Sequence, residues 1–142
     1  MKTNREQVVV EHFHYDRVAP DTAPKTDVQV NINEVTATGD GADEIMARGK
    51  IFQFAVPFEV VLEGFAVSGQ ITQIIQILDF NGTPDDLAAA DMQRLSRPLV
   101  EYIETLTYQV TAVALDQGVQ LDFHAEDDDD SEPFEKITPD DN

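Results

Sequence analysis

Cysteine is absent from this chain of 142 residues. Its absence excludes a disulfide framework, a thiolate nucleophile and every metal centre that depends on cysteine ligands. A chain of this length, with 42% apolar residues, can bury a hydrophobic core in one domain without such cross-links. The composition is compatible with a reducing compartment.

Basic residues are scarce: nine Lys and Arg face 28 Asp and Glu, for a formal net charge of −19. Nucleic acids and anionic membranes attract cationic surfaces, so this charge argues against both as partners. The acidity is shared between the body of the chain and its C-terminal end. Residues 121–142 hold ten of the 28 acids and one lysine, and the other acids lie in residues 1–120. It favours solubility and a basic or polypeptide partner.

Long apolar runs are missing as well. A short basic start is followed by the apolar residues 8–10, but Glu11 ends that run before it reaches the length of a signal peptide. No segment approaches the ~20 apolar residues that a membrane-spanning helix requires. We therefore expect a cytoplasmic protein that does not contact a membrane.

The first half of the chain is rich in β-branched and aromatic residues, which favour extended structure. The pattern predicts four strands, at residues 7–18, 27–38, 44–56 and about 58–70. Residues 39–41 predict a hairpin turn, and Pro57 is expected to end or bend the third strand. Residues 71–78 suit a helix by spacing and a strand by β-branched content; we favour the strand.

The second half of the chain has a helical pattern. Thr83, Pro84 and the two acids after them are typical of a helix start. Pro98 predicts a break or kink near residues 96–97. Beyond it, apolar residues recur every three or four positions and predict one buried stripe: Leu99, Ile103, Leu106, Val110 and Val113.

The chain changes character after this helix. Gly118 is expected to stop the helix, and Val119, Leu121 and Phe123 then alternate as in a short extended segment. We expect one domain over residues 1–125 and an acidic, disordered tail over residues 126–142. The acids at 126–130 are oxygen ligands of the type that calcium accepts, but they lack the spacing of an EF-hand loop, so a solvated tail is favoured.

His12, His14 and Asp16 would project from one face of the first strand. A His-x-His pair can chelate a metal ion, because alternate residues of a strand point the same way. His124 could be a third ligand only if the fold brings it close. A half-exposed strand face with polar ends is the plainer interpretation, so we expect no metal.

Catalytic motifs are missing from the sequence: it has no G-x-S-x-G, Walker A, G-x-G-x-x-G or H-E-x-x-H pattern. Glu59 and Glu63 flank apolar strand residues, but a general acid also needs a buried setting, which a sequence does not reveal. We therefore expect a protein that is not an enzyme and that uses no cofactor.

Phe52, Phe54, Phe58 and Phe65 fall on two adjacent predicted strands around a proline. The plainer interpretation is an ordinary core. The functional interpretation is a partly open apolar surface that accepts extended polypeptide. A sheet covered by helices on one side leaves its second face exposed to solvent or to a partner. Large exposed apolar patches are unusual on monomers, so we expect a homodimer or homotetramer.

The order of these segments resembles the SecB-like fold of the bacterial export chaperone over about residues 8–123. The resemblance is carried by these features: the aromatic first strand and the proline crossover after it, the strand at residues 27–32, the Gly64-Phe65 pair, the helix at Pro98 and the extended segment 119–123. The chain looks closer still to a family of small cytosolic bacterial proteins of unknown function that share this fold.

The resemblance implies an α+β fold, with a four-stranded antiparallel sheet and C-terminal helices packed on one face. It also implies an ATP-independent, chaperone-like protein of protein transport that binds non-native or extended polypeptide, and that assembles as a dimer or a dimer of dimers. The alternative is an oligomeric adaptor or structural protein that binds one specific partner without holdase activity. A third possibility is a small-ligand or catalytic site at a subunit interface.

Overall fold

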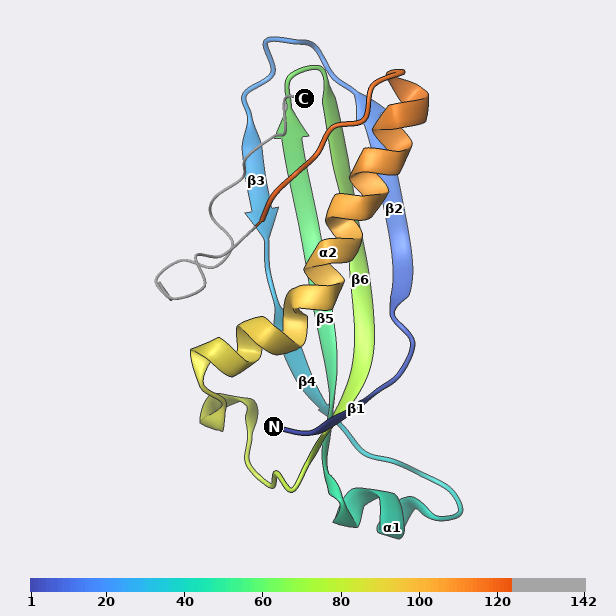
Figure 1. The fold of residues 1–142 in the computed structure, drawn as a ribbon, viewed down its shortest axis with the longest axis vertical. Coiled ribbons are helices and arrows are strands. Elements are labelled where there is room, and N and C mark those ends of the chain that lie inside the picture. The colour runs from blue at the N-terminus through green and yellow to red at the C-terminus, as the bar shows by residue number, and fades with distance from the viewer. Residues whose placement is uncertain (124–142) are drawn as a thin grey trace.

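The centre of the fold is a long antiparallel hairpin made by β5 (Gly49–Leu62) and β6 (Phe65–Leu78), shown in Figure 1. The computed structural model describes residues 1–123. The register pairs Gly49 with Leu78 at one end and Leu62 with Phe65 at the other. Gly64, at φ 90°, makes the turn possible, because a side chain at this φ would be strained.

Each outer position of the sheet is filled by two short strands. β1 (Thr3–Arg5) and β2 (Val9–Arg17) pair with β6, while β3 (Lys25–Val28) and β4 (Asn31–Val35) pair with β5. The predicted α+β class and antiparallel sheet are confirmed. The expected four strands are instead six, because each edge strand is interrupted once.

Pro57 lies inside β5, so the prediction that the third strand ends there is wrong. Its carbonyl accepts a hydrogen bond from the Gln29 N–H (3.1 Å), at the gap between β3 and β4. Because the N–H and carbonyl of one strand residue face the same neighbour, the missing proline N–H also faces this gap. The interruption of the edge strand therefore accommodates the proline.

The third strand begins later than predicted, because residues 42–47 form the short helix α1 (Ala42–Ala47). The glycine-rich stretch before it leads into this helix and does not form a tight hairpin turn. β4 and β5 nevertheless pair antiparallel, as predicted. The strand preference for residues 71–78 is confirmed, because β6 continues through all of them.

One long helix, α2 (Ala89–Ala114), follows a 3₁₀ turn, η1 (Pro84–Asp86). The predicted start at Thr83 and Pro84 produces only this turn, which the Asp86 carboxylate stabilises by accepting the Thr83 N–H (2.8 Å). Pro98 lies within α2 and does not break it. Figure 1 shows the first turns of α2 bending away from the rest, as expected for a proline kink. The expected set of C-terminal helices is thus a single helix.

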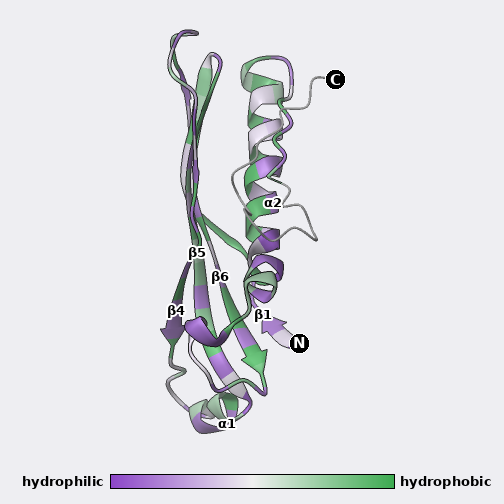
Figure 2. Cartoon of the chain, turned by 90° about the vertical axis from the view of Figure 1, so that its left-hand side faces the viewer, coloured by the Kyte–Doolittle hydropathy of each residue, from purple (hydrophilic) through white to green (hydrophobic). Residues whose placement is uncertain are grey.

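α2 packs on one face of the sheet, as Figure 2 shows. Its buried positions are Leu95, Ser96, Leu99, Val100, Ile103, Thr107 and Thr111. Val113, which the apolar stripe included, is 87% exposed, so that part of the prediction is wrong. The buried line continues instead in steps of four residues from Leu99 through Ile103 to the two threonines.

The predicted tail at residues 126–142 and His124 lie outside the described residues. Within residues 1–123, no helix combines the length and apolarity that crossing a membrane requires.

Gly69 allows β2, β6 and β5 to pack closely. A bulge in β2 between Val10 and His12 brings the His12 carbonyl oxygen to 2.2 Å from the position of a Gly69 Cβ. The Phe58 Cζ lies 3.0 Å from the same position. The Phe58 ring reaches across the glycine to the Phe13 ring, with 5.9 Å between centroids.

We predict that Gly69→Ala lowers the free energy of unfolding by about 1–3 kcal/mol, because its methyl group would overlap backbone atoms that cannot move aside. Urea denaturation measures the change. Ser68→Ala is the matched control on the opposite face and should change stability by less than about 0.5 kcal/mol. Equal unfolding free energies for the two variants would contradict the close packing at Gly69.

Candidate functional site

The two faces of the sheet differ sharply in chemistry. Cross-strand partners point to the same face. The helix face carries, on β5 and β6, Phe52, Phe54, Val56, Phe58, Val60, Phe65, Val67, Ile71, Ile75 and Ile77. The open face carries Ile51, Gln53, Ala55, Pro57, Glu59, Val61, Ala66, Ser68, Gln70, Thr72, Ile74 and Gln76. α2 lies against the helix face (Figure 2), whereas α1 reaches one end of the open face, where the Ile45 carbonyl accepts a hydrogen bond from the Gln76 Nε2 (2.7 Å).

The four phenylalanines of the sequence hypothesis all lie on the helix face. Phe52, Phe54, Phe58 and Phe65 are at most 5% exposed and belong to one hydrophobic cluster with Leu95, Leu99 and Ile103 of α2. The structure therefore brings them together and encloses them. Their role in binding polypeptide stays a prediction, and it would require α2 to move.

Two aromatic side chains of β2 extend this cluster to the sheet edge. Tyr15 stacks on Phe65, with 6.0 Å between ring centroids, and Phe13 meets Phe58. Both β2 side chains are only partly buried. The aromatic cluster thus runs from beneath α2 to the edge of the sheet.

Among residues 1–123, two buried hydroxyl groups, one on the helix face of the sheet and one on α2, have no hydrogen-bond partner. These groups are the Tyr15 Oη and the Thr107 Oγ1. A buried polar group that makes no hydrogen bond costs about 1–3 kcal/mol, and such groups are uncommon in folded proteins. The helix–sheet contact is therefore weaker than its apolar area alone would make it.

A C-terminal strap, residues 119–123, closes the core beside α2. Leu121 is 1% exposed and Phe123 3% exposed, and both join the hydrophobic cluster. The Thr111 Oγ1 accepts the Val119 N–H (2.8 Å), and the Glu104 Oε2 accepts the Phe123 N–H (2.7 Å). The expected alternation is seen over residues 121–123, where exposed Asp122 lies between buried Leu121 and Phe123, whereas Val119 and Gln120 are both half-buried.

Arg5 fastens the other end of the helix to the sheet. Its Nη1 donates to the Leu95 carbonyl of α2 and to the Gln73 Oε1 of β6, both at 3.1 Å. The Gln73 Nε2 in turn donates to the Glu6 carbonyl (2.8 Å). Burial lowers the pKa of the Arg5 guanidinium. Side-chain hydrogen bonds from Arg5 therefore connect the first half of α2 to the sheet.

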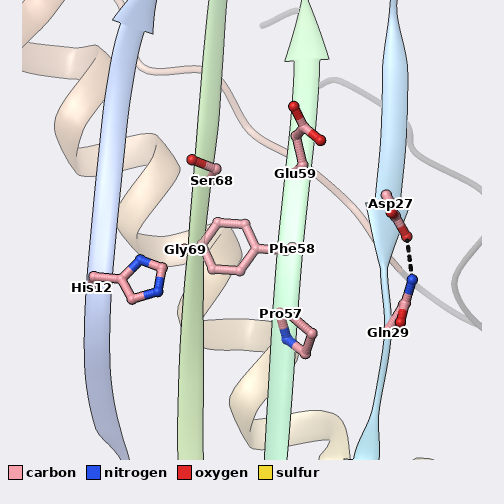
Figure 3. Close-up of a pocket in the computed structure, with 8 residues that line it drawn as sticks. All are labelled: His12, Asp27, Gln29, Pro57, Phe58, Glu59, Ser68 and Gly69. Atoms are coloured by element: carbon pink, nitrogen blue, oxygen red, sulfur yellow. Dashed lines mark hydrogen bonds between the residues drawn. The ribbon is translucent and has the colours of Figure 1, made fainter.

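The open face has a shallow hollow of about 390 Å³, shown in Figure 3 with α2 behind the strands. Its walls are His12, Asp27, Gln29, Pro57, Glu59 and Ser68, and Phe58 and Gly69 complete the lining. The Lys25 Nζ donates to the Glu59 Oε1 (2.7 Å), and this hydrogen bond raises the pKa of Lys25. The Gln29 Nε2 donates to the Asp27 Oδ1 (3.2 Å).

This hollow does not have the features of a buried acid–base site. Glu59 is exposed and paired with a lysine, and Glu63 is exposed in the turn between β5 and β6. Neither carboxylate has the buried setting that a general acid needs. The arrangement is suited to polar contacts with another molecule.

His12, His14 and Asp16 lie on the open face, as the strand pattern predicts. The two imidazole rings are 5.4 Å apart and tilted by 49°. All three residues are exposed. Across residues 1–123, no three His, Asp or Glu side chains come together as a metal ion requires.

The model of a family described as "Protein of unknown function (DUF1149)" matches residues 1–123. The chain belongs to this family. One neighbour in structure is a protein of unknown function from Streptococcus agalactiae, solved as a crystal structure. It is 30% identical, has a TM-score of 0.73, and the match covers 87% of this chain and 98% of that one. No curated protein matches the sequence.

A second structural neighbour is a SecB-like chaperone of Mycobacterium tuberculosis, solved in complex with a ChAD peptide from an antitoxin. It is 12% identical, has a TM-score of 0.53, and the match covers 84% of this chain and 89% of that one. At this identity the likeness shows the fold alone. The resemblance to the SecB-like fold and to a family of unknown function, drawn from the sequence, is confirmed.

Sequence reasoning missed the polar part of the helix–sheet contact. Thr107 and Thr111 lie four and eight residues after Ile103, on the same buried line of α2. A search restricted to apolar residues does not detect this spacing. The Thr111 Oγ1 donates to the Thr107 carbonyl (2.7 Å), the i−4 bond that lets a threonine sit inside a helix.

We predict that Thr107→Val raises the free energy of unfolding by about 1 kcal/mol, because it replaces a buried, unpartnered hydroxyl with a methyl group of the same shape. Thr105→Val is the matched control on the exposed side of α2 and carries the same change in helix propensity. Chemical denaturation of both variants measures the difference. A Thr107→Val protein no more stable than its control would show that the hydroxyl is satisfied in solution.

Proposed function

We propose that this protein binds non-native or extended polypeptide without ATP, in the manner of a SecB-like chaperone. Phe52, Phe54, Phe58 and Phe65 would form the contact surface after α2 moves away from the sheet. One observation carries the proposal: a continuous aromatic cluster is covered by one helix, and the buried Thr107 hydroxyl of that helix has no partner among the described residues.

The energetic argument compares two ways of opening the domain. Separating β5 from β6 would break a continuous ladder of paired residues from Gly49 to Leu62. Lifting the second half of α2 would separate none of the paired strands and would expose the buried Thr107 hydroxyl, which is worth about 1–3 kcal/mol when it regains a partner. Local opening of the helix is therefore expected to require less free energy than separation of the two strands.

A bound client would replace the contacts that α2 gives up. Each phenylalanine side chain offers about 150–250 Å² of surface for a client's apolar residues. Such contacts are not directional, so clients need apolar segments and not one defined sequence. No Walker A motif is present in the sequence, which supports binding without nucleotide hydrolysis. The proposed function includes no catalytic step.

β2 supports a second contact with an extended chain. It is nine residues long, it lies at the edge of the sheet, and among the described residues it pairs with β6 alone. The outer row of N–H and carbonyl groups on such an edge can pair with another strand. We propose that a second copy of the chain adds here, which would make the protein a homodimer or homotetramer. Light scattering on the purified protein measures the mass.

The open-face hollow favours the adaptor alternative. A partner that places a polar or basic side chain between Asp27 and Glu59 could bind the folded protein without any movement of α2. That function would show as capture of one specific folded partner, with no effect on the aggregation of unfolded proteins.

The proposed function predicts that the protein suppresses aggregation of a chemically unfolded model protein at stoichiometric amounts. Binding is then quantified with reduced, carboxymethylated α-lactalbumin, which stays soluble and unfolded. Thr107→Val should bind this client about fivefold more weakly, because about 1 kcal/mol of added helix stability must be overcome. Thr105→Val should bind it as the unaltered protein does.

Two results would overturn the proposal. The first is a protein that leaves aggregation unchanged while its native mass is intact. The second is equal client affinity for Thr107→Val and Thr105→Val when denaturation shows that only the former is stabilised, because the client would then bind without helix movement.

A further inference from the structure

The C-terminal strap shows what kind of peptide the helix-covered core accepts. Its five residues follow the end of α2 and belong to no strand of the sheet. In Figure 1 the strap runs back along α2 on the side of β5 and β3. Leu121 and Phe123 are nevertheless as deeply buried as the central sheet residues. An extended segment thus already occupies part of the aromatic core.

Over residues 121–123 the strap alternates between buried and exposed side chains. Val119, Leu121 and Phe123 pack on the cluster, Asp122 is exposed, and Gln120 is half-buried like Val119. This period of two is the pattern of an extended peptide that lies with one edge against an apolar surface. The core beside α2 therefore selects a short extended segment with large apolar side chains at alternate positions.

Few bonds hold the strap to the helix. Side chains of α2, at Thr111 and Glu104, accept two of its N–H groups, and both acceptors belong to the element that the proposed function requires to move. Lifting α2 would remove both acceptors at once. The strap and the helix are therefore expected to leave the core together.

We propose that the strap is a built-in ligand, which occupies the site for extended client segments with apolar residues at alternate positions. A client must displace Leu121 and Phe123 before it can bind. This inference rests on the proposed function and specifies its client class and its regulation. The strap is tethered to the site, so its effective concentration is high and few molecules have an unoccupied site. The smaller this fraction is, the weaker is the client's apparent affinity.

The test uses the full chain and a fluorescein-labelled peptide with the sequence of residues 117–123. The double variant Leu121→Ser, Phe123→Ser empties the site, and Gln120→Ser, Asp122→Ser is the matched control with the same strap length. Fluorescence anisotropy should show the labelled peptide binding the first variant at least about tenfold more tightly than the control or the unaltered protein. Circular dichroism checks that each variant is folded.

A second variant keeps the inference testable if the emptied site unfolds the protein. Leu121→Ala shortens one of the two buried side chains of the strap and leaves Phe123 in place, and Asp122→Ala is its matched control at an exposed strap position. The Leu121→Ala protein should bind reduced, carboxymethylated α-lactalbumin about fivefold more tightly than the Asp122→Ala protein.

The outcomes separate this inference from the proposed function. If the Leu121→Ala, Asp122→Ala and unaltered proteins all bind the unfolded client equally well, the strap inference is overturned and the proposed function stands. If the emptied variant binds the strap peptide but no form binds the client, the site for extended segments is supported and the chaperone-like function is overturned. Failure of a folded emptied variant to bind the strap peptide overturns the strap inference directly.

Discussion

The packing of α2 on the aromatic face of the β5–β6 hairpin is the contact on which the rest of the structure depends. Without it, the phenylalanines and isoleucines of that face would be in water, at a cost of about 25 cal/mol for each Å². Arg5 fixes one end of the helix to the sheet, and the strap closes the core beside it. The short outer strands widen the sheet beneath the helix. All of these features stabilise the same contact between α2 and the sheet.

This contact is built less tightly than it might be. Ser96, Thr107 and Thr111 are buried in it, and the Thr107 hydroxyl and the Tyr15 hydroxyl have no partner among the described residues. An ordinary core would gain stability from apolar residues there. Polar groups buried between α2 and the aromatic face are consistent with the proposed opening of this contact.

The sequence predicted the antiparallel sheet, the identity of the main aromatic cluster and the alternation of the strap, because these depend on local periodicity. It did not predict that β5 passes through Pro57, because the gap in the neighbouring strand that accommodates the proline is a tertiary feature. The sequence pattern placed Val113 in the core because Val113 is apolar, but Val113 is exposed. The geometry of α2 buries Thr107 and Thr111 instead. Enclosure of the phenylalanines by α2 could not be read from residue types, since core and binding surface use the same ones.

Native-state hydrogen exchange, followed residue by residue without any client, tests the central claim most directly. If the helix–sheet contact is the weak layer, amides in the second half of α2 and in the strap will exchange through an opening of lower free energy than amides of β5 and β6. Exchange of all four elements only through global unfolding, with one common free energy, would contradict the claim that the aromatic face can be uncovered while the sheet stays intact.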